Sequence, residues 1–119
     1  MNIAMRAVVF GAVGTAGQRC TTTRRVIIHE SVYEAFKKKL VAAYKQLNIG
    51  DPLNEKNHVG PLIDKDAVQN YLNAIEALKK EGAKVVVAGG VLSGKGYESG
   101  CYVKPCIYEV SNDMQIVQH

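Results

Sequence analysis

Met5 to Thr22 reads MRAVVFGAVGTAGQRCTT, and this stretch decides how the 119-residue sequence is interpreted. As far as Val13, most residues are small or apolar, so a helix formed by them is apolar on nearly every side. This pattern predicts a short buried helix. Gly14 and Gly17 then break the apolar run. Glycine lets the backbone turn tightly, so we expect a turn that projects Gln18-Arg19-Cys20 into a cleft.

A strand and a helix are predicted directly after the cysteine. Arg25 to His29 is a β-branched run of strand length, which favours a buried strand. Ser31 is placed to cap a helix that carries apolar residues at three- and four-residue spacings and ends near Gly50. The polar sequence from Gly50 to Leu62 is expected to form a turn and a loop with little regular structure.

The second half of the sequence continues this alternation. Asp64 or Asp66 is expected to open a helix that stops at Glu81-Gly82. Lys84 to Ala88 is predicted to be a short strand, followed by a glycine-rich loop or hairpin. The last predicted strand is Tyr102 to Val110, where a proline at position 105 indicates an edge or a bulge. Alternating helices and strands predict the α/β fold class.

Composition narrows the class of protein. With 47% hydrophobic and 22% charged residues, the chain has the composition of an ordinary globular protein. Its net charge of +4 is spread over the outer faces of predicted helices, which argues against a nucleic-acid partner. No segment approaches the roughly 20 apolar residues of a membrane span, so no membrane association is expected.

Cysteine and histidine usage indicates neither disulfides nor a metal. Cys20, Cys101 and Cys106 make an odd count without a CxxC pair, which suggests a reducing compartment. We therefore expect a cytoplasmic location, or the mitochondrial matrix if the source is eukaryotic. His29 and His58 share no ligand spacing with a cysteine or with each other, so no metal site is predicted.

Two interpretations of the glycine-rich stretch compete on spacing alone. Gly11-x-x-Gly14-x-x-Gly17 resembles the dinucleotide-binding turn that opens extended short-chain reductases. However, only Gln18 to Arg24 separate the last glycine from the strand at Val26, and a crossover connection needs roughly a dozen residues. The alternative is that the turn presents Cys20 as a nucleophile, because a thiolate is the strongest nucleophile among side chains near neutral pH. A third interpretation treats Cys20 as a small buried hydrophobe.

Several motifs resemble the aldehyde dehydrogenase superfamily, and most of all its antiquitin branch, the α-aminoadipic semialdehyde dehydrogenases. The cysteine region GTAGQRCTT, residues 14–22, is typical of that branch. Further matches follow in the order that the family shows, namely GDP at 50–52, HVGPL at 58–62, EGA at 81–83, GG at 89–90 and YVKP at 102–105. The likeness therefore covers nearly the whole chain.

The resemblance implies a role for three adjacent residues. Cys20 would attack an aldehyde carbonyl to give a thiohemiacetal, with its own backbone N–H as an oxyanion donor. Oxidation by NAD or NADP would leave a thioester that water hydrolyses to the acid. Arg19 and Thr21 match positions that line the substrate tunnel, and Arg19 suits a semialdehyde bearing a distal carboxylate. For Arg19 a surface ion pair is the alternative.

The resemblance also implies that residues 1–119 are a partial catalytic domain of the aldehyde dehydrogenase fold. The family's NAD-binding sheet and general-base glutamate precede the cysteine, and its oligomerisation strands follow later, so this chain is expected to hold no cofactor-binding residues. A fragment without oxidising activity is therefore expected. The alternative is a non-catalytic remnant that binds a partner, its own copies or the missing domains through exposed apolar surface.

Overall fold

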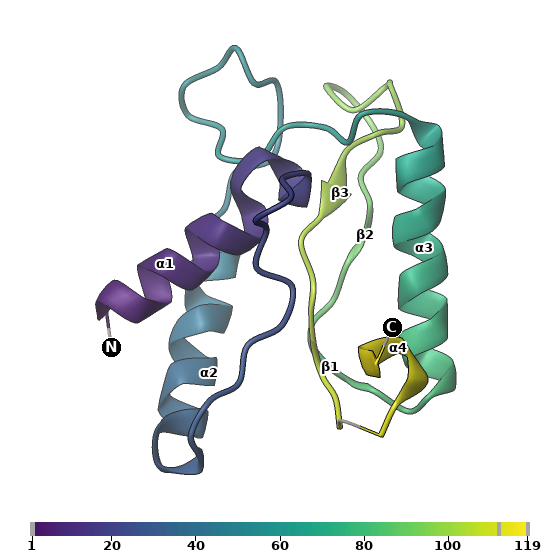
Figure 1. The fold of residues 1–119 in the computed structure, drawn as a ribbon. Coiled ribbons are helices and arrows are strands. Elements are labelled where there is room, and N and C mark those ends of the chain that lie inside the picture. Colours follow the sequence, from purple (N-terminus) through teal and green to yellow (C-terminus); the bar gives the residue numbers. More distant parts are fainter. Residues whose placement is uncertain (1, 112, 119) are drawn as a thin grey trace. The chain divides into compact units, whose positions relative to one another are not determined.

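The computed structural model describes residues 2–111 and 113–118, which form two compact units, Met1–Pro61 and Leu62–His119. Figure 1 shows the fold along the chain. The first unit contains α1 (Asn2–Val13), the 3-10 helix η1 (Gly14–Gly17) and α2 (Glu30–Lys45). The second contains α3 (Lys65–Lys80), β1 (Lys84–Val87), β2 (Gly90–Val91), β3 (Val103–Lys104), β4 (Ile107–Glu109) and α4 (Gln115–Gln118). None of the described helices is long and apolar enough to cross a membrane.

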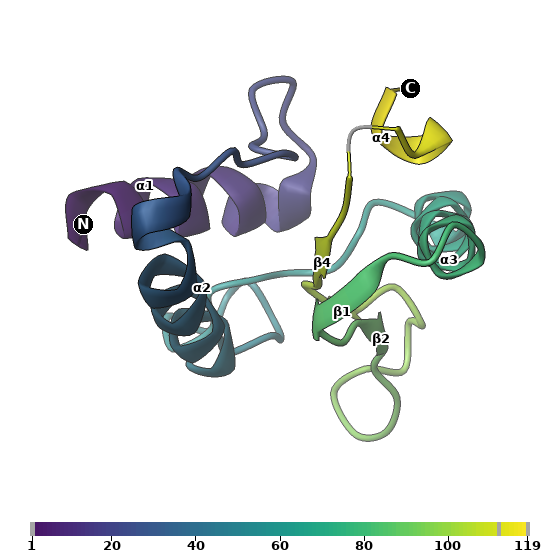
Figure 2. The same ribbon diagram turned by 90° about the horizontal axis from the view of Figure 1, so that it is seen from below.

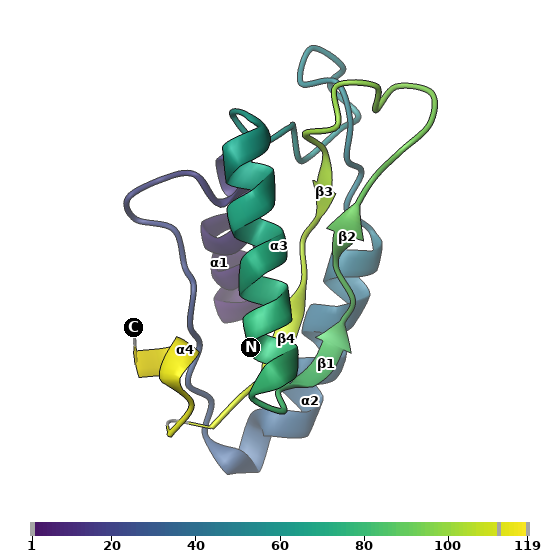
Figure 3. The same cartoon turned by 90° about the vertical axis from the view of Figure 1, so that its right-hand side faces the viewer.

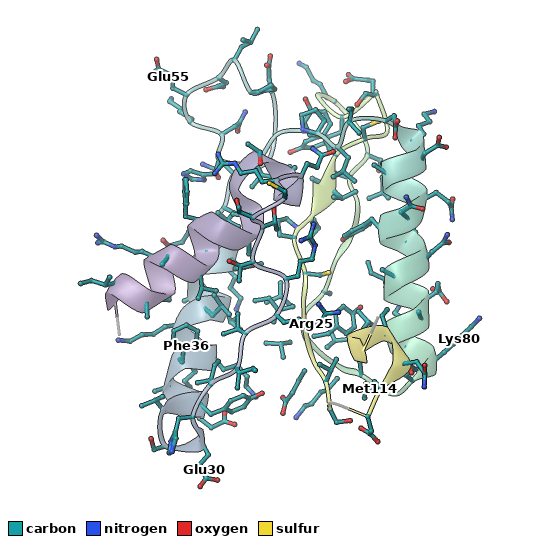
Figure 4. All side chains as sticks on the ribbon, viewed as in Figure 1. Arg25, Glu30, Phe36, Glu55, Lys80 and Met114 are labelled. Carbon is teal, nitrogen blue, oxygen red and sulfur yellow. The ribbon has the colours of Figure 1, made fainter. Side chains whose placement is uncertain are left out.

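In the first unit, α1 lies across α2, as Figures 1 and 2 both show. The side chains buried in this unit include Val13 at the end of α1, Phe36 and Leu40 on α2, and Val59 in the following loop. Phe36 and Leu40 are four residues apart, so they share one face of α2, as the apolar spacing predicts. Figure 4 labels Phe36 on this helix.

The prediction of a helix before the glycines is confirmed, but the prediction that it is buried is wrong. Ile3 is 86% exposed and Phe10 is 65% exposed, although both lie in α1. A helix that is apolar on nearly every side needs neighbours all round to be buried. Within its unit α1 contacts η1 and α2, and these two helices leave Ile3 and Phe10 uncovered.

The predicted strand from Arg25 to His29 is also wrong. Residues 22–29 run without regular structure from the cysteine turn to the beginning of α2, and no described strand pairs with them. Ile27 is 98% exposed and Val26 is 44% exposed, so the segment is not buried either. A strand requires a neighbouring backbone to accept and donate its hydrogen bonds, and β-branched residues alone cannot supply one. Arg25, labelled in Figure 4, lies in this segment.

Side chains at the helix N-termini explain where the helices begin. His29, rather than the predicted Ser31, caps α2: its Nδ1 accepts a hydrogen bond of 3.1 Å from the Ser31 backbone N–H. Asp64 caps α3 as predicted, with Oδ1 accepting from the Ala67 N–H at 2.8 Å. Each cap satisfies an N–H that the first helical turn leaves without a partner. Ser31 lies within the helix, where its hydroxyl is 2.9 Å from His29 Nδ1.

The second unit packs α3 beside one long, interrupted antiparallel hairpin, which Figure 3 shows from the side. β1 pairs with β4 and β2 pairs with β3, and the Leu92 N–H continues the ladder to the Tyr102 carbonyl at 2.8 Å. The predicted strand at Lys84 is confirmed. The single strand predicted from Tyr102 to Val110 is instead two short strands, β3 and β4, and Pro105, where an edge or a bulge was predicted, lies between them. The helix stop at Glu81-Gly82 is confirmed as well: Glu81 is the C-cap and Gly82 has a φ of +82°.

Tyr71 on α3 joins the two sides of the hairpin at this interruption. Its hydroxyl donates to the Lys104 carbonyl at 2.6 Å and accepts from the Gly90 N–H at 2.8 Å. Gly89 makes room for it, because a Cβ at that position would lie 2.2 Å from the hydroxyl oxygen. One side chain therefore replaces the ladder hydrogen bonds that are lost where the strands part.

We expect Tyr71→Phe to destabilise the second unit by about 1–2 kcal/mol, because both backbone groups lose their partner while the ring still packs. Urea unfolding of the parent and variant chains measures the difference. Tyr102→Phe, in the same unit, is the matched control, because the Tyr102 hydroxyl forms no hydrogen bond with the described residues. A variant as stable as the parent chain would show that water replaces the hydroxyl without cost.

Tyr71 also predicts how stability depends on pH. Burial raises the pKa of Tyr71 to about 12, above its value of about 10 in an unfolded chain. The neutral hydroxyl therefore contributes stability that is complete below about pH 10 and is lost as the pH rises towards 12. Urea titrations across this range should show a smaller fall in stability for Tyr71→Phe than for the parent chain. An equal fall would contradict this assignment.

Candidate functional site

The backbone reverses sharply between α1 and the cysteine. Thr15, Ala16 and Gly17 follow one another with φ values of 52°, 55° and 72°, all in the left-handed region. This conformation costs roughly 1–2 kcal/mol for each residue that carries a Cβ, and glycine adopts it freely. The Gln18 N–H donates to the Thr15 carbonyl at 3.1 Å and closes the turn. The predicted glycine turn is therefore confirmed, and two of its left-handed positions are not glycine.

A second turn carries the cysteine. The Thr22 N–H donates to the Arg19 carbonyl at 3.2 Å, and the Arg19 N–H donates to Thr22 Oγ1 at 3.0 Å. These two hydrogen bonds close a four-residue turn with Cys20 and Thr21 at its centre. Both central residues are exposed. The turn therefore presents the thiol outward instead of packing it, which disfavours the interpretation of Cys20 as a small buried hydrophobe.

The cysteine turn is anchored to the last turns of α1. The Thr23 N–H donates to the Gly11 carbonyl at 2.9 Å. Gly11 permits this approach, since a Cβ there would lie 2.5 Å from Thr23 Oγ1. A glycine inside a helix costs stability relative to alanine, so its presence is explained by the close passage of another segment.

The backbone N–H of Cys20 donates no hydrogen bond to any acceptor among residues 2–111 and 113–118. It is thus available to an oxygen atom that approaches the thiol. In the same part of the chain, no carboxylate or imidazole forms a hydrogen bond with Cys20. The turn alone therefore offers a nucleophile and one donor, without a general base.

Arg19 folds back along α1. Its guanidinium carbon lies 5.3 Å from the centre of the Phe10 ring, which is a cation–π contact. The guanidinium also passes Gly14, where a Cβ would lie 3.8 Å from Arg19 Nη1. The surface ion pair weighed for Arg19 is not formed with any described residue. Thr21 is exposed beside Cys20. The roles of Arg19 and Thr21 towards a substrate stay predictions.

A hollow of about 390 Å³ lies beside this site and not at the thiol. Thr15, Ala16 and Gln18 line it together with Pro52 and the loop residues 57–61, and Cys20 does not.

The interpretation of the three glycines as a dinucleotide-binding turn is wrong. That turn requires a strand before the first glycine, whereas Val8, Val9 and Phe10 lie in α1. Gly11 is itself a helical residue, and its missing side chain serves the approach of Thr23.

His58, Cys101 and Cys106 each have a structural neighbour. His58 Nδ1 accepts from the Asn48 N–H at 3.0 Å, and Cys101 Sγ lies 3.8 Å from the Ser99 carbonyl oxygen. Burial raises the pKa of Cys106, which lies beside Tyr71. Within the described ranges, no three His, Cys, Asp or Glu side chains are grouped so that they can hold a metal ion.

Sequence reasoning missed the residues that hold the cysteine turn in place. From the sequence we predict no role for Thr22 or Thr23, although a threonine side chain is suited to form hydrogen bonds with nearby backbone groups. Gly11 was considered only as part of a phosphate-binding pattern. A glycine within an otherwise helical run was the available signal for close contact with another segment.

Comparisons with known proteins give matches over nearly the whole chain. A model of the Aldehyde dehydrogenase family matches residues 1–119. Aldehyde dehydrogenase family 7 member A1 of Pisum sativum is 48% identical over 118 residues, 99% of this chain and 22% of that protein. Alpha-aminoadipic semialdehyde dehydrogenase of Bos taurus is 41% identical over 118 residues, 98% of this chain and 21% of that protein. This chain thus spans about 22% of the first of these relatives.

A solved structure supports the same relationship. A protein of Sinorhizobium meliloti 1021, assigned as a methylmalonate-semialdehyde dehydrogenase and solved in complex with NAD, superposes with a TM-score of 0.88. It is 32% identical, and the match covers 99% of this chain and 24% of that one.

We expect Gly11→Ala to destabilise the first unit by about 1 kcal/mol, because overpacking against Thr23 Oγ1 outweighs the gain in helix propensity. In a Thr23→Ala background the same substitution should stabilise by up to about 1 kcal/mol, since the colliding oxygen is gone. Urea unfolding of the four chains of this double-mutant cycle measures both values. The same sign in both backgrounds would contradict the close approach.

Proposed function

Because the chain belongs to the aldehyde dehydrogenase family, we propose that it is the cysteine-bearing part of an NAD(P)-dependent enzyme that oxidises an aldehyde to its carboxylic acid. Membership confirms the resemblance found in the residues around Cys20 and the α/β fold class. Semialdehyde dehydrogenases are among the relatives. The observation that carries the proposal is the exposed Cys20 at the centre of a turn held by hydrogen bonds at both ends.

In the proposed reaction, the Cys20 thiolate forms a bond to the carbonyl carbon of the aldehyde. The electron pair of the C=O double bond moves to the oxygen, and a thiohemiacetal results after protonation. The free backbone N–H of Cys20 is suited to stabilise the negative charge on that oxygen. The rigid turn contributes by keeping the thiol and this N–H in a constant mutual geometry.

The described strands form antiparallel pairs, and the glycines follow a helix, so no parallel βαβ unit is present among the described residues. Oxidation of the thiohemiacetal to the thioester needs a hydride acceptor, which NAD(P) supplies in the family. We therefore propose that the isolated chain stops at the thiohemiacetal, and that hydride transfer and thioester hydrolysis require other parts of the enzyme.

We propose a semialdehyde with a distal carboxylate as the substrate class. Arg19 directly precedes the nucleophile, and its guanidinium has no carboxylate partner within the described part of the chain. A guanidinium binds a carboxylate through two parallel N–H···O bonds. Thr21, on the other side of Cys20, is proposed to line the path of the same substrate.

The proposal predicts that an aldehyde shields Cys20 from alkylation. With the 119-residue chain, iodoacetamide labelling of each cysteine is followed by peptide mass spectrometry in the presence of succinic semialdehyde or butanal. We expect both aldehydes to slow labelling of Cys20, with succinic semialdehyde effective at about two- to fivefold lower concentration because of its ion pair with Arg19. Cys101 is the internal control.

Equal shielding of Cys20 and Cys101 would contradict the role of the cysteine turn. Selective shielding of Cys20 with no preference between the two aldehydes would support the nucleophile and contradict the carboxylate preference. Cys20→Ser removes the shielded signal, because this variant has no thiol at position 20 to form a thiohemiacetal or to be alkylated.

A second candidate function is assembly through the extended segment before α2. Ile27 is 98% exposed, and the backbone of residues 24–28 makes no ladder with a described strand. An unpaired, β-branched segment is a template for pairing with another chain. A second copy of this chain, or another part of the enzyme, is the proposed partner.

This second candidate predicts concentration-dependent self-association of the isolated chain. Sedimentation velocity should show dimers or larger species, and Ile27→Lys should shift them to monomers, because a charge on the pairing segment opposes addition of a strand. Leu53→Lys is the matched control, because Leu53 is 91% exposed and lies outside the pairing segment. Loss of association in the control alone would assign the contact to a different surface.

A further inference from the structure

The contact between Arg19 and Phe10 joins the cysteine turn to α1, at a residue nine positions earlier in the sequence. Phe10 is 65% exposed, an unusual position for a large apolar ring, and the guanidinium of Arg19 covers part of it at 5.3 Å from the ring centre. Gly14, the first residue of η1, follows four residues after Phe10. A Cβ at position 14 would be 3.8 Å from Arg19 Nη1, so the arginine side chain passes close to this residue as well.

Stacking restricts an arginine without consuming its hydrogen-bonding capacity. The ring contacts the face of the guanidinium, while the five N–H donors lie in its plane and point outward from its edge. No described side chain forms an ion pair with these donors. The arrangement therefore holds a cation in a limited range of orientations with its carboxylate-binding edge unoccupied by protein groups.

We infer that Phe10 is a positioning residue for substrate specificity: its ring holds the Arg19 guanidinium so that the donor edge receives the distal carboxylate of an aldehyde bound at Cys20. This inference rests on the proposed function. It assigns a purpose to an exposed aromatic residue that neither the core of the unit nor the cysteine turn requires. Preorganisation of a long side chain strengthens binding because less conformational freedom is lost when the ligand arrives.

The charge selectivity of Cys20 alkylation tests this inference. Iodoacetate is an anion and iodoacetamide is neutral, and the two otherwise react alike. The ratio of the iodoacetate rate to the iodoacetamide rate at Cys20 therefore rises when a cation is held near the thiol. Rates are measured on the 119-residue chain at low ionic strength by peptide mass spectrometry. The variants are Arg19→Gln, Phe10→Leu, Phe10→Tyr and the double variant Phe10→Leu/Arg19→Gln.

We expect Arg19→Gln to lower the ratio, and Phe10→Leu to lower it by about two- to fivefold, the range of an exposed cation–π contact. Phe10→Tyr should keep the parent ratio because it keeps the ring. The double variant should match Arg19→Gln, since Phe10 acts only through the arginine. A general loosening of the fold would alter the iodoacetamide rate and the melting curve, and would not by itself change the selectivity for charge.

The outcomes separate this inference from the proposed function. If Arg19→Gln lowers the ratio while Phe10→Leu leaves it at the parent value, the positioning role of Phe10 is overturned and the role of Arg19 stands. If Arg19→Gln has no effect, the proposed carboxylate recognition fails, and the inference fails with it. If the double variant falls below both single variants, Phe10 acts by a route other than Arg19, which also overturns the inference.

Discussion

The first unit depends on the close passage of two backbones, α1 at Gly11 and the returning chain at Thr23. The hydrogen bond between them is 2.9 Å long, and the missing side chain of Gly11 leaves space for Thr23 Oγ1 beside it. Between these two contact points the chain must reverse within eleven residues, and this requirement accounts for the left-handed backbone of Thr15 and Ala16. Cys20, which is exposed, lies between these left-handed residues and Thr23. Strain of this kind persists where the surrounding contacts over-determine the conformation.

The second unit uses a polar side chain for a comparable purpose. Its hairpin is interrupted at Pro105, where strand hydrogen bonds cannot continue, and the hydroxyl of Tyr71 bridges the two sides from α3. Gly89 again supplies the space. In both units a glycine therefore admits a neighbouring segment, and a hydrogen bond from that segment satisfies backbone groups that would otherwise lack a partner.

The site that results is simple. It has one exposed nucleophile, a free backbone donor and an arginine stacked on an aromatic ring, and each comes from the first unit. The family's reaction needs more than this, because a thiohemiacetal must still lose a hydride and a thioester must still meet water. The chain covers about 22% of the length of a relative such as the Pisum sativum protein. Activity is accordingly a proposal about the enzyme as a whole, and the chemistry assigned to this chain is limited to what Cys20 and its neighbours can do.

Local sequence signals by themselves determined much of this protein. The cap at Asp64, one of two candidates, and the stop at Glu81-Gly82 were predictable, because each depends on the geometry of a few adjacent residues. The cysteine motif likewise identified the family, since its spacing is specific. Burial and pairing were decided only by tertiary structure. Ile27 has every local property of a core strand and is 98% exposed, because a strand exists only beside another strand and no sequence pattern states which segment that neighbour will be.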